Sequence, residues 1–518
     1  CEPEEQNIND EPIEYGTVIS YSHEGSTLYY VIDESSQAAT VVAPLFPDYP
    51  KDTLSRIIGW QDYEQPKGNV IIPEKVEFSG HSFPVTAIGD GAFSLCKKIT
   101  AVTIPEGVTT VGEEVFDTCT ELASINLPGG ITSLGKWTFA DCASLTSITI
   151  PNGVKAIANS LFYGCLSLTE VNLPEGLTSL GDNAFHSCRS LTSISIPSTV
   201  TAIGIGCFWD DLSLETITIP KGVTTIEGAT FAYCTNLKSI SLPEGITTVE
   251  AWAFLGCDSL KALDFKDGLV SLKDGAVGYC SGLTSVHLPE GFETIGITVF
   301  NSCISLSQIN FPSTLTSIGD FAFQYADQLG PDVVLPEGLK SLGYAAFGDC
   351  HNMESISLPN SLEVIGDHLF DSCWKLNNVS FPDHLTSIGS STFSYCYALS
   401  NVHLPSQLQS IDEWLFCATA IKQVDIPDQV TTIGEGAFGE CRKLKELTIP
   451  ASVTELADSV FLFGTHLQKL VLKSAVPPSA TETTFDYFNT SITVPQGSYQ
   501  AYHNHDIWGR FAIIQEEE

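Results

Sequence analysis

The chain has 518 residues, 43% of them hydrophobic, so it has enough apolar side chains for a large core. Its 62 acidic and 23 basic residues give a formal net charge of −39, which repels phosphate backbones and excludes nucleic acid as a partner. No run of about 20 consecutive apolar residues occurs, so no membrane-spanning helix is predicted.

The first segment, residues 1–12, begins with Cys1 and continues with polar and acidic residues. A cysteine at the first position is typical of a lipoprotein whose signal peptide has been removed, and it then carries the lipid. The alternative is an arbitrary sequence boundary. We therefore expect an exported protein that contacts a membrane only through a lipid on Cys1, with residues 1–12 as an acidic linker.

Residues 13–75 contain short runs with strand character, such as Thr27–Asp33 and Ala38–Ala43. Beyond them, a regular repeat dominates the chain. Its marker is an aromatic residue in the pattern [A/V/T/L]-F-x-x-C, and the steps between markers are 23 residues except for one of 24, at Phe347, and one of 22, at Phe438. The markers are Phe93, Phe116, Phe139, Phe162, Phe185, Phe208, Phe231, Phe254, Val277, Phe300, Phe323, Phe347, Phe370, Phe393, Phe416, Phe438 and Phe461.

One copy of the repeat, residues 139–157, shows what each part does. Ser147–Ile150 alternates polar and apolar residues, which predicts a strand with its isoleucines facing inward. Pro151-Asn152-Gly153 then supplies the residues of a turn. The apolar residues of the A-F-x-x-C segment lie at i, i+1 and i+4, which fits one side of a short helix.

A unit of this size cannot bury its apolar side alone, so the copies must stack into a solenoid. The consensus L-x-x-I-x-[IL]-P-x-[GS]-[VL]-T-x-I-G-x-x-[AV]-F-x-x-C resembles the BspA-type leucine-rich repeat of bacterial surface proteins. The resemblance covers about residues 76–472, and it implies a leucine-rich-repeat solenoid of about 17 repeats. Each repeat would contribute short parallel strands and a short helical turn.

Both ends of such a solenoid need covering, because an open end exposes core and unpaired strand edges. We therefore interpret residues 13–75 as an N-terminal β cap and residues 473–518 as a C-terminal cap. The resemblance further implies a secreted or cell-surface protein of a host-associated bacterium that adheres to host components. The expected location is the bacterial cell surface, anchored by lipid at the outer membrane.

Of 16 cysteines, 13 lie three residues after a marker, and such a ladder suggests a disulfide framework. Paired strands, however, hold equivalent Cβ atoms about 5 Å apart, whereas a disulfide requires about 3.8 Å. Free, buried thiols are therefore the preferred interpretation. No Cys-x-x-Cys occurs and no histidine shares the phase, so neither a metal nor a cofactor is expected.

No nucleophile elbow, zinc-protease helix or phosphate-binding loop is present, so no catalytic residue is predicted. A carbohydrate-active enzyme with an unrecognised pair of carboxylates stays open as a less favoured alternative.

Candidate contact residues lie two or three positions before the marker, where most copies carry a small or polar residue. A few copies carry a large aromatic residue there instead: Trp137, Trp252, Phe321, Tyr344 and Trp414. Exposed aromatic patches often mark contact sites for proteins or sugars. The alternative is that each ring folds back over its own repeat.

The strand position between the two inward aliphatic residues offers a second candidate surface. It reads Asn126, Thr149, Asn172, Ser195, Thr218, Ser241, Asp264, His287 and Asn310, a polar strip that also fits the solvated side of a sheet. The sequence therefore predicts a monomeric, non-catalytic adhesion protein that binds a host or matrix protein or a glycan. A structural or self-associating spacer is the alternative function.

Overall fold

The computed structural model describes residues 17–44, 59–60, 63–464 and 466–517. Cys1 and the predicted acidic linker lie outside these residues. The chain divides into two compact units, unit 1 over Cys1–Ser213 and unit 2 over Leu214–Glu518, which are described separately below.

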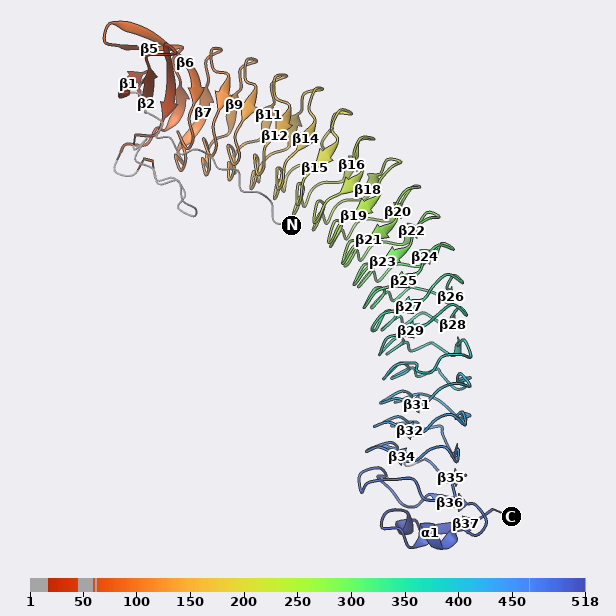
Figure 1. Ribbon diagram of the computed structural model, residues 1–518. Coiled ribbons are helices and arrows are strands. Elements are labelled where there is room, and N and C mark those ends of the chain that lie inside the picture. Colours follow the sequence, from red (N-terminus) through yellow and green to blue (C-terminus); the bar gives the residue numbers. More distant parts are fainter. Residues whose placement is uncertain (1–16, 45–58, 61–62, 465, 518) are drawn as a thin grey trace. The chain divides into compact units, whose positions relative to one another are not determined.

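In both units each repeat forms one coil, most coils carry two short strands, and equivalent strands of neighbouring coils pair in parallel (Figure 1). The strands before the Pro-containing turn form ladder A, and those after it form ladder B. Proline lacks an N–H and fixes φ, so it ends the ladder A strand after a few residues. The carbonyl of Pro105 accepts the N–H of Val108 at 3.1 Å, which closes the turn.

Unit 1 begins with an antiparallel meander whose last strand pairs in parallel with the solenoid. Its strands are β1 (Thr17–His23), β2 (Ser26–Asp33) and β3 (Ala38–Val42), with β5 (Lys75–Phe78) antiparallel to β6. Ladder A contains β4 (Gly68–Ile71), β7 (Ile99–Thr103), β9 (Ser124–Asn126), β11 (Ser147–Thr149) and β13 (Glu170–Asn172). Ladder B contains β6 (His81–Ile88), β8 (Thr110–Val111), β10 (Ser133–Leu134), β12 (Ala156–Ile157), β14 (Ser179–Leu180) and β15 (Ala202–Ile203).

Unit 2 repeats the same two ladders and contains a short helical segment before its last strand. Ladder A contains β16 (Thr216–Thr218), β18 (Ser239–Ser241), β20 (Ala262–Asp264), β22 (Ser285–His287), β24 (Gln308–Ile309), β26 (Asp332–Val334), β28 (Ser355–Ser357), β30 (Asn378–Ser380), β33 (Glu446–Ile449), β35 (Lys469–Leu472), β36 (Ser491–Val494) and β37 (Ile513–Glu516). Ladder B contains β17 (Thr225–Ile226), β19 (Thr248–Val249), β21 (Ser271–Leu272), β23 (Thr294–Ile295), β25 (Ser317–Ile318), β27 (Ser341–Leu342), β29 (Val364–Ile365), β31 (Ser410–Ile411), β32 (Thr432–Ile433) and β34 (Glu455–Leu456). The helices are α1 (Tyr499–His503) and the 3-10 helix η1 (Trp508–Arg510).

The last strands show how unit 2 ends. β36 pairs in parallel with β35, and β37 with β36, so these two strands extend ladder A beyond the last predicted repeat, which ends at residue 472. Phe485 stacks on Phe461 at a centroid distance of 5.5 Å, and Trp508 and Phe511 pack edge-on against it. The aromatic residues near the C-terminus therefore cover the exposed end of the phenylalanine ladder.

The marker phenylalanines form the centre of the core. In unit 1 the rings from Phe93 to Phe208 stack nearly parallel, with centroids 5.3 to 5.7 Å apart. In unit 2 a second run extends from Phe300 to Phe485, with spacings of 5.2 to 6.2 Å. All of these rings are buried, and each fills space between two neighbouring coils, so no coil has a complete core by itself.

The cysteines form a second ladder beside the phenylalanines. Every cysteine in the described residues is free and buried, which confirms the thiol interpretation. The Cys119 Sγ donates to the carbonyl of Phe93 at 3.2 Å, and the Cys373 Sγ donates to the carbonyl of Phe347 at 3.1 Å. Burial raises the pKa of the Cys119 thiol well above its usual range, so this thiol stays protonated and acts as a small hydrophobic group.

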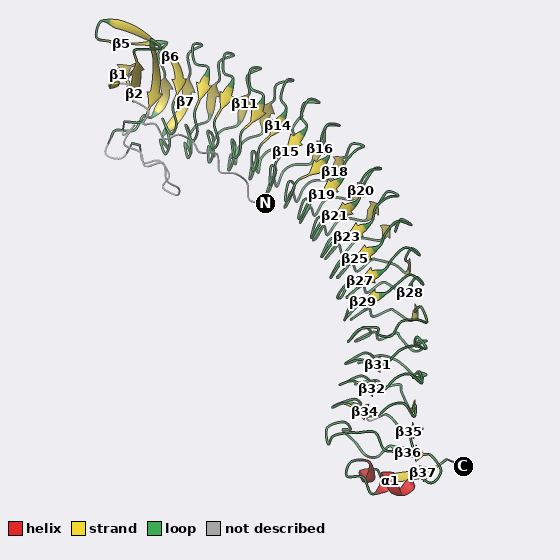
Figure 2. Ribbon diagram, in the orientation of Figure 1, coloured by secondary structure: helices red, strands yellow, loops and turns green. Residues whose placement is uncertain are grey.

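The predicted helical turn in each repeat is wrong. Figure 2 shows loops at the marker segments, and α1 and η1 are the helices found among the described residues. The reason is that the residues two before and two after the marker have positive φ, such as 54° at Glu114 and 59° at Thr118. The N–H groups of these residues donate to carbonyls of the next coil: Glu114 to Lys136 O at 2.8 Å and Thr118 to Ala140 O at 2.7 Å. In an α-helix they would instead donate to the carbonyl four residues earlier in the same segment.

Candidate functional site

The segment around each marker, from three residues before it to four after it, is here called the turn loop. Hydrogen bonds between consecutive turn loops fix their spacing, as when the N–H of Phe347 donates to Leu369 O at 3.1 Å. Side chains two and four residues after the marker therefore form columns along one edge of the stacked coils. A surface on this edge is assembled from several coils, each of which contributes one or two side chains.

The five predicted aromatic residues lie in turn loops, but their surroundings differ. In unit 2, Phe321 and Tyr344 contact each other with centroids 5.0 Å apart, and Tyr344 contacts His368 at the same distance. Phe321 is half-buried and Tyr344 is exposed. Two of the predicted residues, on adjacent coils, therefore form one contiguous aromatic contact.

Trp252 and Trp414 lie over a glycine of the following coil. A Cβ at Gly275 would stand 2.6 Å from Trp252 Cδ1, and a Cβ at Gly436 would stand 2.3 Å from Trp414 Cε3. Trp252 stays exposed, whereas Trp414 is half-buried. These rings fold over the neighbouring coil and not over their own, so part of their role is to pack against that coil.

The Trp414–Gly436 pair gives a sharp prediction. Gly436→Ala is expected to lower the free energy of unfolding by about 1 to 3 kcal/mol, because the new methyl group overlaps the indole. The backbone conformation adds to the cost, since Gly436 has a φ of 61°, but it does not forbid alanine, because Ala229 and Ala345 occupy the same repeat position with φ of 53° and 47°. Chemical denaturation measures the loss.

The control for this prediction removes the indole. In a Trp414→Ala background, Gly436→Ala should cost clearly less, since the methyl group no longer meets a ring and only the strain of a left-handed alanine remains. Equal costs in both backgrounds would contradict the packing role of Trp414.

Trp137 belongs to an aromatic column in unit 1. Its ring lies 5.3 Å from Tyr163, which lies 4.5 Å from His186, which in turn lies 5.4 Å from Trp209. These rings face one another across four consecutive coils, so the interior rings offer edges and not open faces to a ligand. Burial lowers the pKa of His186, consistent with a neutral ring within the column.

The structure adds aromatic residues that the sequence prediction missed. In the described part of unit 2, all exposed large aromatic side chains except Tyr487 lie in turn loops, and their exposed fractions are 38% to 58%. Tyr487 lies two residues after Phe485, which stacks on the last marker, Phe461. We call these exposed side chains the aromatic edge: Tyr233, Trp252, Tyr279, Tyr325, Tyr344, Trp374, Tyr395, Tyr397, Phe463 and Tyr487. Most lie two or four residues after the marker, so a search downstream of the marker could have found them.

Carboxylates accompany the aromatic edge in three of four consecutive coils. We call this region the aromatic–acidic patch: Tyr325, Asp327, Asp349, His351, Asp371, Trp374, Tyr395 and Tyr397. The His351 Nδ1 lies 2.6 Å from an Asp327 oxygen, and its ring packs on Trp374 with centroids 3.8 Å apart. The N–H of Ala398 donates to Trp374 O at 3.1 Å, which places Tyr395 and Tyr397 on the coil after Trp374.

Charges within the aromatic–acidic patch are only partly balanced. Asp349 lies 4.0 Å from His351 Nε2, and Asp371 lies 2.9 Å from His368 Nδ1. Burial raises the pKa of Asp349, and the nearby Asp371 and Asp327 add to the shift. Three carboxylates thus have two histidines as ion-pair partners, and Asp371 and Asp327 lie close enough to Asp349 to disfavour its charged form.

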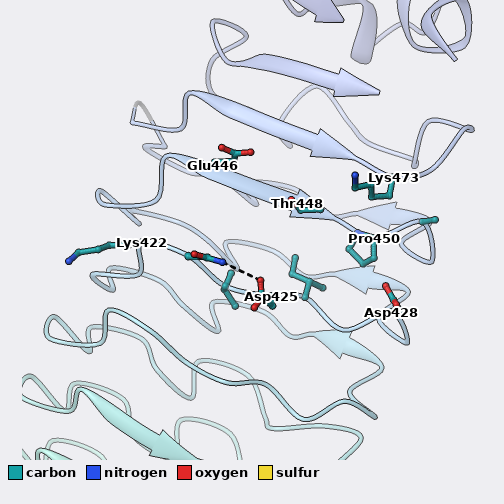
Figure 3. A pocket seen from close by; sticks show the side chains of 11 residues that line it. Lys422, Asp425, Asp428, Glu446, Thr448, Pro450 and Lys473 are labelled. Carbon is teal, nitrogen blue, oxygen red and sulfur yellow. Dashed lines mark hydrogen bonds between the residues drawn. The ribbon is translucent and has the colours of Figure 1, made fainter. Parts of the chain in front are cut away.

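A groove of about 610 Å³ opens elsewhere in unit 2, on the ladder A side (Figure 3). It lies between residues 422–428 and β33. In the described residues β33 pairs with β35 on its other side, and no strand pairs with it on the side of residues 422–428. This coil is the one shortened by a residue between Phe416 and Phe438. We therefore attribute the groove to the shortened repeat. Two of the residues that line it have ion-pair partners, since Glu446 pairs with Lys469 at 2.9 Å and Lys473 pairs with Glu517.

The polar strip predicted on ladder A is exposed to solvent along its length, as at Asn126, Thr149 and His287. The Asn172 side chain donates to the Thr149 hydroxyl of the preceding coil at 3.3 Å. Within the described residues, no group of three or more His, Cys, Asp or Glu side chains could hold a metal ion. The described residues also contain no helix long and apolar enough to cross a membrane.

Comparison with known proteins agrees with this geometry. The family model for the BspA type leucine-rich repeat region matches residues 86–212, 201–330, 330–438 and 415–500. No curated protein matches the chain significantly. Among solved structures, a leucine-rich repeat protein from Bacteroides ovatus is 25% identical, with a TM-score of 0.56, and the match covers 83% of this chain and 95% of that one.

Two further solved structures are similar at lower scores. A leucine-rich cell surface protein from Faecalibacterium prausnitzii is 23% identical over 90% of this chain and 96% of its own, with a TM-score of 0.35. The pneumococcal vaccine antigen PcpA is 16% identical over 97% of this chain and 99% of its own, with a TM-score of 0.42.

Proposed function

Because this chain belongs to the BspA-type leucine-rich repeat family, we propose that it is a cell-surface adhesion protein without catalytic activity. It binds a protein or glycan partner through the aromatic edge of unit 2. The observation that carries the proposal is the gathering of exposed Tyr, Trp and Phe side chains in the turn loops. Tyrosine and tryptophan are the residues most often found at the energetic centres of interfaces.

The rigidity of the scaffold supports a binding role. Backbone hydrogen bonds hold successive turn loops together, and buried rings stack beneath them. The backbone of such a frame loses little conformational freedom on binding, so more of the contact energy appears as affinity. The partner contacts side chains of several coils at once, since each coil supplies only one or two.

The proposal includes export and a lipid anchor at the bacterial outer membrane, attached through Cys1. Mass spectrometry of the native protein tests for the lipid on Cys1. The proposed state is a monomer that takes no nucleic acid partner, in keeping with the net charge of −39.

Among the predicted contact residues, the structure gives the strongest support to Trp252 and to the Phe321–Tyr344 pair. Trp252 and Tyr344 are exposed, and Phe321 supports Tyr344 from the adjacent coil. Trp137 and Trp414 are half-buried against neighbouring coils, which favours a packing role for these two residues.

The test is a binding screen of the full chain against extracellular matrix proteins and immobilised glycans. For a partner found in this way, Trp374→Ala and Tyr397→Ala are each expected to weaken binding about tenfold, the loss that accompanies truncation of an important interface residue. Val334→Ala, an exposed apolar residue on ladder A, is the control and should leave affinity unchanged.

Two outcomes would contradict the proposal. If no variant of the aromatic edge changes binding, the edge is not the contact surface. If the screen finds no partner and the chain associates with itself, a structural or self-associating spacer explains the protein better. Hydrolysis of any glycan by the purified chain would instead support the carbohydrate-active alternative.

A further inference from the structure

The aromatic–acidic patch differs from the rest of the aromatic edge in its charge. We infer that it binds a cationic, extended polypeptide segment that presents lysine or arginine side chains. The inference rests on the proposed binding function and names the chemical class of the partner. A neutral glycan is the competing occupant.

The first support is the pairing of aromatic rings with carboxylates. Trp374, Tyr395 and Tyr397 are exposed, and ring faces attract ammonium and guanidinium groups. Asp371 lies on the same turn loop as Trp374 and Asp349 on the preceding one, and both can accept charge-assisted hydrogen bonds from such groups. Lysine and arginine satisfy both requirements, because their apolar stems pack on rings while their charged ends reach the carboxylates.

The second support is the unbalanced charge. The ion pairs found for Asp327, Asp349 and Asp371 in the described residues are with His351 and His368. The nearby basic side chains have other partners: Lys375 Nζ donates to Asn352 at 2.8 Å, and Arg442 pairs with Glu440 at 3.1 Å. A partner's cation would stabilise the charged form of Asp349, whose burial raises its pKa.

The third support is the spacing of the coils. Ring centroids of Phe323, Phe347, Phe370 and Phe393 are 5.2, 6.2 and 6.0 Å apart, which gives the rise per coil in this region. In an extended chain, alternate side chains on one face lie about 6.6 Å apart. Alternate residues of an extended segment running along the stack can therefore each meet a successive coil, which favours a Lys-x-Lys or Arg-x-Arg pattern.

The experiment measures binding of the full chain to labelled synthetic peptides by fluorescence anisotropy. The probes are peptides of alternating lysine and serine, arginine and serine, or glutamate and serine, and a neutral oligosaccharide of N-acetylglucosamine. The cationic peptides are expected to bind, with an affinity that falls as salt rises, and the other two probes are not. Trp374→Ala and Tyr397→Ala should each weaken peptide binding about tenfold.

A matched pair of double variants separates the patch from the general acidity of the chain. Asp349→Asn with Asp371→Asn should weaken peptide binding about tenfold and reduce its salt dependence. Glu290→Gln with Glu337→Gln removes the same charge from Pro-Glu-Gly turns outside the turn loops and should have little effect. Equal weakening by both pairs would overturn the inference, because long-range attraction alone would then explain binding.

Failure of the inference and failure of the proposed function give different results. If Trp374→Ala and Tyr397→Ala abolish binding of the oligosaccharide or of a screened partner while the Asp349 and Asp371 variants do not, the edge binds a neutral partner. The inference then falls and the proposed function stands. If no probe or screened partner responds to any of these variants, both fall. Unchanged unfolding midpoints establish that each variant is folded.

Discussion

Phe347→Ala is expected to lower the free energy of unfolding of unit 2 by about 3 to 5 kcal/mol, the usual cost of truncating a buried phenylalanine. The Phe347 ring is fully buried, and its centroid lies 5.2 Å from that of Phe323 and 6.2 Å from that of Phe370. Its removal opens a cavity between neighbouring coils, and backbone hydrogen bonds between turn loops prevent the coils from closing over it. Urea denaturation followed by circular dichroism measures the loss.

The effect should also be local, because each coil of a solenoid contacts only its neighbours. Amide hydrogen exchange should accelerate most in the turn loops around Phe323, Phe347 and Phe370. Val364→Ala, in the same repeat but at an exposed site, is the control, with an expected change below about 0.5 kcal/mol. Similar losses for the two variants would show that the phenylalanine ladder does not dominate the stability of unit 2.

The core could be predicted from the sequence because the same residue type recurs at the same repeat position. Phe and Cys three residues apart, followed by aliphatic residues, define the buried side of most coils, and a ladder buries them all. The structure confirms the leucine-rich-repeat solenoid, the parallel strands and the free thiols.

The helical turn was mispredicted because apolar residues at i, i+1 and i+4 also fit a loop with two left-handed residues. A signal for that loop was present in the sequence. Glycine recurs at the two left-handed positions, as at Gly91 and Gly275 before the marker and Gly164 and Gly256 after it. Asn and Asp, which tolerate this conformation, also occur there, as at Asn183 and Asp349.

The candidate site was harder to predict, because repeat position does not decide exposure. Trp252 and Trp414 share one position and both lie over glycine, yet one is exposed and the other half-buried. Exposure depends on the side chains of the neighbouring coils, and these vary from copy to copy. The pairing of Trp374 with His351 depends likewise on two separate coils and becomes visible only in the structure.

Asp211→Asn is expected to stabilise the protein at neutral pH, on the order of 2 kcal/mol, because it removes an ionisable group from the core. Asp211 occupies the ladder position of cysteine and is fully buried in unit 1. One carboxyl oxygen accepts the N–H of Cys188 at 2.7 Å, and the other has no hydrogen-bond partner. Burial raises the pKa of Asp211 well above its ordinary value.

The raised pKa fixes the direction of the pH dependence. Above the ordinary aspartate pKa of 3.8 the unfolded chain loses this proton, whereas the folded chain keeps it until the higher, folded pKa is reached. The folded state then binds more protons, so the Asp211 contribution to stability falls as pH rises between the two values. The stability difference between Asp211→Asn and the natural chain should therefore be small in acid and grow toward neutral pH.

The measurement is the unfolding free energy of both chains across this pH range, with Glu175→Gln as the control for the loss of one negative charge at an exposed site. Asp211→Cys should also stabilise the chain, because a thiol there can donate to the Phe185 carbonyl as Cys188 donates to that of Phe162. A difference between Asp211→Asn and the natural chain that does not change with pH would contradict the titration argument. If only Asp211→Cys raised the free energy of unfolding, the gain would come from packing, since asparagine and aspartate differ little in volume.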